Sequence, residues 1–373
     1  MNASGLKYRI LNSPGYKTKK KYVIIQSDDW GSIRMPSNEI RKSLSKHKGL
    51  SVDDLYSHYD SLCTPNDLDA LFDTLRKFRD TEGNHPIITA NAVMANPDFT
   101  KMKADNYQNY FKEPIAKTFD RYDLNNSLNL WKEGEQNGLF DFQYHGQEHV
   151  NVPFWLIALQ EGPKAVRDAA NYKVFAANFD DLNLRKKNFQ AAWDFNTPEQ
   201  EAIILKLVRD GLQDFKKFFQ KDSLSVIAPS YTWSDSIENL LINLGVQDMQ
   251  GMMFRKIPVI GRKKYKRKLI WTKKANVKKM GYQVRNIFFE PTLFNQKNQV
   301  EPSLFRMEQA FRAGKPAIIG SHRINFSGSL DESNRTNSLQ QLEHFLKEAL
   351  RRWPDIQFIS CSSFAKIKNG ELK

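Results

Sequence analysis

Short apolar runs alternate with longer amphipathic stretches along most of the 373 residues, and this alternation constrains the fold more than any other feature. Parallel strands need a crossover between neighbours, which is usually a helix, so the pattern favours an α/β fold with mostly parallel strands. The predicted strands are 22–26, 87–93, 140–144, 174–178, 225–228, 284–289, 317–320 and 357–360. The predicted helices are 37–45, 66–78, 125–137, 198–220, 234–244, 302–313 and 338–352.

Polar side chains with chemical uses stand where nearly every predicted strand ends. In a parallel barrel, the carboxyl ends of the strands meet on one face, and that face carries the active site. We therefore expect these residues to share one pocket. They are Asp28, Asp29, Asn91, His145, Ser230, Tyr231, Glu290 and His322.

Two of these strand ends predict a metal site. His145 and His149 are four residues apart, so on a helical turn both imidazoles lie on one face and reach a single ion. Asp29, from another strand end, completes a set of two histidines and one carboxylate with open positions left for water. That set is typical of a catalytic divalent metal, and it leaves the neighbouring Asp28 free to act as a base.

The net charge of +14 is concentrated in one segment. Residues 255–285 contain 13 lysines and arginines and no acidic residue. Such a run is either a solvated loop or a docking surface for phosphate, anionic glycan or anionic lipid. No recognition-helix, zinc-finger or RNA-binding signature accompanies the charge, so nucleic acid is not the expected partner.

Several protein classes are disfavoured by what the sequence lacks. Its two cysteines, Cys63 and Cys361, make no disulfide framework, and no Cys-x-x-Cys zinc pattern occurs. The first eight residues have no apolar core of a signal peptide, and no stretch of about 18 apolar residues occurs. We expect a soluble, cytoplasmic protein, which would be peripheral to the membrane if the basic segment docks there.

The order of the motifs resembles that of the polysaccharide deacetylases, the superfamily of chitin, xylan and peptidoglycan deacetylases. The resemblance implies a distorted (β/α)7 barrel over residues 21–365, after an N-terminal extension of residues 1–20. Residues 97–123 and 156–197 are then insertions, and 255–285 is a basic loop. The motifs that carry the likeness are Asp28-Asp29 followed by Gly31, His145-x-x-x-His149, Pro229-Ser230-Tyr231, and the apolar run before His322.

The resemblance also implies a role for each motif residue. Asp29, His145 and His149 would bind the metal, most readily zinc, with cobalt, nickel or iron as alternatives. Asp28 would be the general base and His322 the general acid. The backbone N–H of Tyr231 would bind the oxyanion. These residue types suit amide hydrolysis, which needs a polarised carbonyl, fixed oxyanion donors and a proton for the departing amine.

The sequence departs from the family pattern at several points. No arginine stands in the segment 226–231 to pair with the base aspartate, and Arg34 or Arg285 is the expected substitute. Trp30 follows the second aspartate directly, where the family has glycine. Glu290 is the expected partner that orients the acid histidine. We expect the substrate to be contacted by Trp30, Asn91, Ser230, Trp233 and Arg285.

The sequence therefore predicts a metal-dependent hydrolase that removes an acetyl group from an N-acetylated or O-acetylated sugar or glycan precursor. If the precursor is linked to a nucleotide or lipid carrier, the basic segment is placed to bind its diphosphate. Two alternatives remain open. The chain is a carbohydrate-binding member of the fold without turnover, or a glycoside hydrolase that uses Asp28 and Glu290 as its carboxylate pair.

Overall fold

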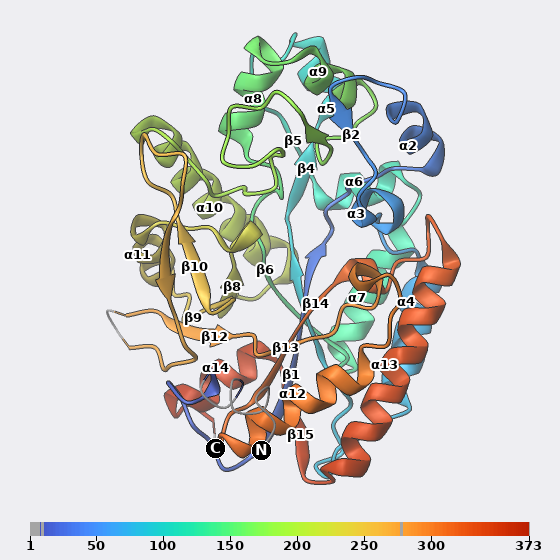
Figure 1. The fold of residues 1–373 in the computed structure, drawn as a ribbon, viewed down its shortest axis with the longest axis vertical. Coiled ribbons are helices and arrows are strands. Elements are labelled where there is room, and N and C mark those ends of the chain that lie inside the picture. Colours follow the sequence, from blue (N-terminus) through green and yellow to red (C-terminus); the bar gives the residue numbers. More distant parts are fainter. Residues whose placement is uncertain (1–7, 9–10, 277–278, 373) are drawn as a thin grey trace.

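A nine-stranded sheet forms the centre of the computed structural model, and all of its strand pairs are parallel (Figure 1). The structure describes residues 8, 11–276 and 279–372. The strand order is β12-β9-β8-β6-β3-β1-β14-β13, and β15 pairs with β1 outside this path. The strands are β1 (Lys21–Trp30), β3 (Ile88–Ala92), β6 (Phe140–Tyr144), β8 (Ser225–Ile227), β9 (Asp248–Gly251), β12 (Gly281–Val284), β13 (Ile287–Phe288), β14 (Ala317–His322) and β15 (Ile356–Phe358).

The two ends of the strand path belong to one continuous piece of chain. Only Arg285 and Asn286 separate β12 from β13. The amide of Arg285 donates to the carbonyl of Gly251 in β9, and the amide of Asn286 donates to the carbonyl of Ile318 in β14. The predicted strand 284–289 is thus two short strands that pair with opposite ends of the sheet. The expected α/β class is confirmed, and the strand ladder stays open at this break.

The apolar run of β1 explains its central place. Val23 and Ile25 contact the main core on one face, whereas Tyr22 and Ile24 pack with Ile318 on the other. A strand that is buried on both faces reads as a continuous apolar run, as expected for a parallel sheet covered on both sides.

All of the predicted helices occur, and their ends lie within a few residues of the predicted ones, except at the start of the last long helix. The last long helix begins six residues earlier than predicted, at Glu332. A helix over 361–369 was not predicted. The long helices are α2 (Asn38–Leu44), α4 (Pro65–Arg76), α7 (Asn125–Gln136), α10 (Pro198–Phe219), α11 (Asp235–Asn243), α12 (Val300–Arg312), α13 (Glu332–Arg352) and α14 (Cys361–Asn369).

A second group of elements lies beyond the carboxyl end of β1, at the top of Figure 1. It contains most of the two segments expected to be insertions. Trp155 and Phe175 are central to its own apolar cluster. The elements are β2 (Leu50–Ser51), α3 (Leu55–Tyr59), β4 (Ala95–Pro97), α5 (Phe99–Ala104), β5 (Lys112–Pro114), α6 (Ile115–Arg121), α8 (Val152–Glu161), α9 (Lys164–Asn171) and β7 (Asn178–Phe179).

The predicted strand 174–178 is wrong. Only Asn178 and Phe179 form a strand, and they pair antiparallel with β2 rather than with the main sheet. The apolar residues Val174, Phe175 and Ala177 instead pack into the second cluster. A short apolar run gives the same pattern in a buried loop as in a buried strand.

The first half of the basic segment lies in an antiparallel hairpin of β10 (Phe254–Ile257) and β11 (Lys266–Leu269), and β12 lies near its end. Its first arginine, Arg255, is fully buried and pairs with Asp235 and Glu238 at 2.9 and 2.8 Å. Lys278 lies outside the described residues. Across the described residues, no helix combines the length and the apolar character needed to cross a membrane. The exposed cations of the hairpin are Arg262, Lys263, Lys264, Lys266, Arg267 and Lys268.

Candidate metal centre and its pocket

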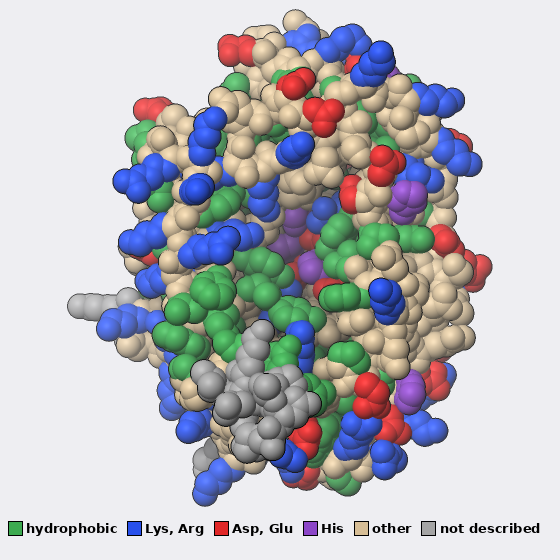
Figure 2. Space-filling view, in the orientation of Figure 1, with side chains coloured by type: hydrophobic (Ala, Val, Ile, Leu, Met, Phe, Trp, Pro, Cys, Tyr) green, Lys and Arg blue, Asp and Glu red, His purple; other side chains and the backbone are tan. Residues whose placement is uncertain are grey.

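A pocket of about 440 Å³ lies where β1, β6, β8 and β14 end. Figure 2 shows it as a hollow in the centre of this face, with histidine side chains inside and basic side chains at its border. Seven of the residues predicted from the sequence line it, so the convergence of strand ends brings them together. These residues are Asp28, Asp29, His145, His149, Ser230, Tyr231 and His322.

Both aspartates at the end of β1 reach the pocket because the strand is irregular there. Consecutive residues of a regular strand face opposite sides of a sheet. The register between β1 and β3 shifts between Ser27 and Trp30, and Asp29 has a φ of 71°. An irregularity of this kind re-aims side chains, and a left-handed non-glycine residue is a strained conformation that is often found at functional sites.

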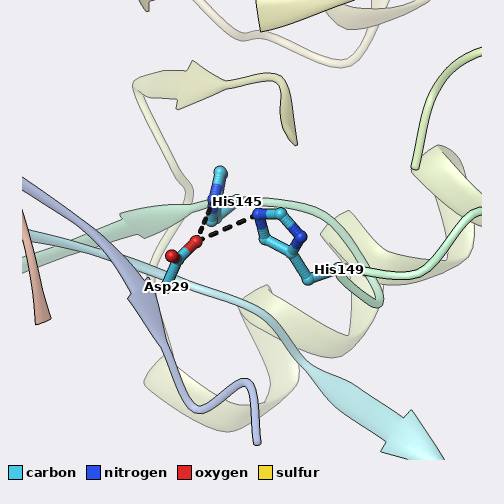
Figure 3. Close-up of side chains that lie close together, drawn as sticks. All are labelled: Asp29, His145 and His149. Carbon is cyan, nitrogen blue, oxygen red and sulfur yellow. Dashed lines mark hydrogen bonds and ion pairs between the residues drawn. The ribbon is translucent and has the colours of Figure 1, made fainter. Parts of the chain in front are cut away.

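Asp29, His145 and His149 form a compact set of possible ligands (Figure 3). Oδ1 of Asp29 lies 3.2 Å from Nε2 of His145 and 3.0 Å from Nε2 of His149. One ligand atom from each residue lies within 4.8 Å of the other two. All three side chains are buried, and this triad is able to hold a metal ion.

The hydrogen bonds around the histidines fit a cation at this point. Nδ1 of His145 is 2.9 Å from the carbonyl of Ile227, which only accepts, so this nitrogen carries the proton. When His145 carries only this proton, the lone pair of Nε2 faces the carboxylate of Asp29, an arrangement that a positive ion between them would stabilise. Burial lowers the pKa of His149 to about 4, so its ring is neutral at neutral pH and has a lone pair to give.

The two histidines do not lie on a helical turn, as was predicted. Residues 145–151 form no helix, and α8 begins only at Val152. Gly146 has a φ of 115°, which a helix does not allow, and it turns the chain so that both rings meet Asp29. The ring centroids are 5.0 Å apart. The four-residue spacing of the histidines correctly indicated that their rings lie close together, but a loop and not a helix brings them there.

Asp29 is held by a buried chain of charges. Its Oδ2 accepts from Nη2 of Arg34 at 2.8 Å, and Arg34 pairs in turn with Asp60 at 3.1 Å. Burial raises the pKa of Asp29, but the charge of Arg34 opposes this most strongly, and the pKa lies well below its usual range. Asp29 is therefore ionised, as a metal ligand must be.

Asp28 is paired with Arg285, which substitutes for the arginine that the segment 226–231 lacks. Nη2 of Arg285 donates to Oδ1 at 2.6 Å, and Nη1 donates to Oδ2 at 2.9 Å. Asn91 donates to Oδ1 at 2.8 Å. Burial raises the pKa of Asp28, but Arg285, His145 and His322 lower it further than that. Arg285 and Asn91 thus position Asp28, and neither lines the pocket in which substrate contacts were expected for them.

His322 bridges Glu290 and Asp28. Its Nδ1 lies 2.6 Å from Oε1 of Glu290, and its Nε2 lies 3.7 Å from Oδ2 of Asp28. The other oxygen of Glu290 accepts from Asn325 at 2.7 Å. Burial lowers the pKa of His322, but the carboxylates of Glu290 and Asp28 outweigh it and raise this pKa to about 9.

Two tryptophans expected to contact substrate lie elsewhere. Trp30 and Trp233 are fully buried. Trp30 packs edge-on against Trp131 and Phe140, because the irregular end of β1 turns it away from the aspartates and into the core. Trp233 lies against Arg255 and donates to Glu238. The expectation that they line the pocket is wrong.

The backbone N–H of Tyr231 also differs from the expectation. It donates to the carbonyl of Ala228 at 2.9 Å within a short 3₁₀ turn, so it does not face an oxyanion. The side chain does line the pocket, and its hydroxyl accepts from Nη1 of Arg285 at 3.1 Å. Burial raises the pKa of this phenol to about 12, so it stays protonated.

Several pocket residues were not predicted from the sequence. Most come from the hairpin, from α3 and from the chain around β7, and no local motif marks them. Arg34 also lines the pocket, but it pairs with Asp29 and not with Asp28, the partner expected for it from the sequence. The unpredicted lining residues are Asp54, Tyr56, Ala176, Asn178, Lys186, Asn188, Gln190, Ala228 and Lys256.

No family model and no curated protein matches the sequence. Among solved structures, a 4-alpha-glucanotransferase from Thermococcus litoralis is 8% identical with a TM-score of 0.46. The alignment covers 92% of this chain but only 40% of that one. A candidate glycoside hydrolase/deacetylase from Parabacteroides distasonis is 9% identical, with 95% and 72% covered and a TM-score of 0.47.

A candidate polysaccharide deacetylase from Mycobacterium smegmatis is 10% identical, with 97% of this chain and 95% of that chain covered and a TM-score of 0.41. At these identities the likeness concerns the course of the chain and not its activity. The structural neighbours of this chain thus include candidate deacetylases, the family that its motifs resemble.

Proposed function

We propose that the protein is a metal-dependent hydrolase that removes an acetyl group from an N-acetylated or O-acetylated sugar or glycan precursor. One observation carries the proposal. The triad of Asp29, His145 and His149 shares a pocket with an ion-paired aspartate, Asp28, and a carboxylate-bound histidine, His322. Metal-assisted hydrolysis of an acetamide uses this combination of a cation, a base and an acid.

A divalent cation held by the triad would supply Lewis acidity toward the acetyl carbonyl and toward the attacking water. Asp28 is the group that accepts the proton of that water. Its Oδ1 already accepts from Asn91 and Arg285, whereas Oδ2 accepts only from Arg285. Oδ2 is therefore the freer oxygen. The pairing with Arg285 keeps Asp28 ionised and fixes its orientation.

His322 is the group that protonates the departing amine or alcohol. Glu290 binds Nδ1, which fixes the tautomer and leaves Nε2 to carry the transferable proton. A pKa of about 9 keeps the ring protonated at neutral pH. The phenol of Tyr231 accepts from Arg285 and keeps its own proton, so it replaces the backbone N–H as the expected oxyanion donor.

The two alternatives have less support. A glycoside hydrolase would use Asp28 and Glu290 on either side of a sugar bond. Both oxygens of Glu290 are engaged by His322 and Asn325, and Glu290 does not line the pocket. A binding protein without turnover would be favoured if Asp28 had no arginine partner, but Arg285 supplies that contact from the two-residue link between β12 and β13.

The test combines metal content with product analysis. Elemental analysis of gently purified wild type should find about one equivalent of transition metal, and His149→Ala should hold little. His344→Ala, which removes a histidine of α13 outside the pocket, is the control and should keep the metal. The loaded wild type should release acetate from acetylated sugars. Reducing sugar without acetate would contradict the proposal and favour the glycoside hydrolase.

A finer part of the proposal concerns the basic hairpin. Its exposed cations lie in the turn and on β11, and β10 of the same hairpin contributes Lys256 to the pocket. We propose that they bind the diphosphate of a nucleotide-linked or lipid-linked substrate.

A further inference from the structure

The part of the pocket outside the candidate catalytic residues is built mainly by residues 176–190 and by Lys256 of β10. The candidate catalytic residues stand at the ends of sheet strands, whereas these belong to the chain around β7 and to the hairpin. Substrate recognition and chemistry therefore come from different parts of the fold.

Lys186 is a half-buried cation with no hydrogen bond or ion pair to any described residue. The charge of Asp194 favours the charged form of Lys186. Asp194 is already bound by Arg185 and by the hydroxyl of Tyr265. Burial and the charge of Lys256 lower the pKa of Lys186 to about 8. It still carries its charge at neutral pH, and an anion beside it would relieve both penalties.

Lys256 is the second cation of this wall. It is half-buried, and its Nζ donates only to a backbone carbonyl, that of Ser230, at 3.3 Å. No carboxylate of the described residues pairs with it. Two lysines that repel each other in one pocket are costly to hold without a negative partner.

The side-chain amide of Gln190 is an independent observation that favours a ligand in this part of the pocket. Gln190 is 7% exposed and lines the pocket, yet neither its Oε1 nor its Nε2 has a hydrogen-bond partner among the described residues. Native proteins rarely bury an amide in this state. Ser230 donates to its backbone carbonyl at 3.3 Å, which ties this wall to the turn beside the metal triad.

The charges of the pocket leave an excess of positive sign. Asp28 is neutralised by Arg285, and Asp29 by Arg34. Asp54 caps α3 and accepts from Ser57, and its charge offsets only one of the two lysines. A bound divalent cation would add to the excess. A neutral acetylated sugar would leave the two lysines unpaired.

We propose that Lys186 and Lys256 bind a carboxylate or phosphate group carried by the acetylated sugar, while the amide of Gln190 hydrogen-bonds the same sugar. This inference rests on the proposed function for the identity of the sugar, but the anion site itself does not need turnover. The substrate is then an anionic sugar, and the lysines select it by charge.

The test measures binding of sugars that carry neither an acetyl group nor an amine and are not turned over. Calorimetry compares glucose, glucose phosphate and glucuronic acid on the metal-loaded protein. Wild type should bind at least one of the two anionic sugars about tenfold more tightly than glucose, as charge-assisted hydrogen bonds imply. The phosphate and the carboxylate members show which anion the site takes.

Variants then assign the preference to the wall. Lys186→Gln and Lys256→Gln should each reduce the ratio of anionic to neutral affinity about tenfold. Lys187→Gln removes the exposed neighbour and is the matched control, which should keep the ratio. Because every variant retains the metal triad, binding of anions to the metal cancels in the comparison.

Equal affinities of wild type for neutral and anionic sugars would overturn the inference. An equal change in Lys186→Gln and Lys187→Gln would do so too. Failure of the proposed function looks different, because acetate release and metal content are measured separately. An anion preference that disappears in Lys186→Gln in a protein without acetate release would support the anion site and contradict the deacetylase.

Discussion

Asp28 and Asp29 are neighbours with different electrostatic surroundings. Asp28 pairs with Arg285, and Asp29 pairs with Arg34 and faces two histidines. Adjacent carboxylates thus avoid repelling each other, since each has its own guanidinium. The difference in partners fits the proposed roles, proton transfer for Asp28 and metal binding for Asp29.

Replacing the base should separate chemistry from metal binding. Asp28→Asn keeps a side chain that can still contact Arg285 but cannot accept a proton at neutral pH. We expect the metal content to stay at the wild-type level and the rate of acetate release to fall about 10²- to 10⁴-fold. Elemental analysis and acetate assays check the two effects. Full activity of Asp28→Asn would show that another group is the base.

The pH dependence of the reaction should report on His322. Its pKa is raised to about 9, so the acid form is present at neutral pH and is lost as the pH rises through that value. We expect kcat/KM to fall on the alkaline side near pH 9. Glu290→Gln removes the main charge that favours the protonated ring, so its alkaline limb should move to lower pH.

The matched control for Glu290→Gln is Glu161→Gln, which changes an exposed glutamate at the end of α8. It should leave the pH profile in place. If the alkaline limb of Glu290→Gln coincides with that of wild type, His322 is not the group that titrates.

At the scale of elements, the hairpin of β10 and β11 has two kinds of cation. Those between residues 262 and 268 are exposed, whereas Arg255 is buried against Trp233 and Glu238. A charge run in a sequence does not distinguish the two, because the partners of Arg255 lie on another element, α11. Functional and structural charges therefore have to be tested by different measurements.

Neutralising the exposed cations tests the docking proposal. A variant with Lys263, Lys264, Lys266, Arg267 and Lys268 changed to glutamine should bind diphosphate-linked sugars more weakly and with less dependence on salt. Titrations at low and high ionic strength measure both effects. Unchanged affinity and an unchanged salt response would refute docking at this hairpin.

Replacing Arg255 should act on stability instead. Arg255→Gln leaves Glu238 without its cation in a largely buried site, and breaking such a pair costs about 3–5 kcal/mol of unfolding free energy. Denaturant unfolding measures the loss, with Arg262→Gln as the exposed control that should change the stability by less than about 0.5 kcal/mol. Equal stability of the two variants would mean that the pair contributes little.

At the scale of the whole molecule, both the parallel sheet and the elements beyond its carboxyl ends build the pocket. The sheet brings together side chains at the ends of β1, β6 and β14, and the second apolar cluster supports the loop that carries Lys186 and Gln190. In the proposed function, the sheet positions the reacting groups and the connecting segments beyond it contact the substrate, as is common where loops lie on a rigid scaffold. An anionic substrate would bind across the boundary between them.

Much of this organisation is visible in the sequence because it depends on local patterns. The apolar run of β1, the period of the helices and the polar residues at strand ends each reflect short-range rules of burial and hydrogen bonding. These rules were enough to predict the α/β class and to bring Asp28, Asp29, His145, His149 and His322 into one pocket.

Only the tertiary structure decided which partner each of these residues has. Arg285 reaches Asp28 across 257 positions of chain, and Glu238 reaches Arg255 from a helix. The irregular end of β1 turns Trp30 into the core, and Gly146 replaces a helical turn with a loop. Local periodicity does not encode such contacts, because they depend on how distant elements pack and on the few residues whose backbone leaves the regular pattern.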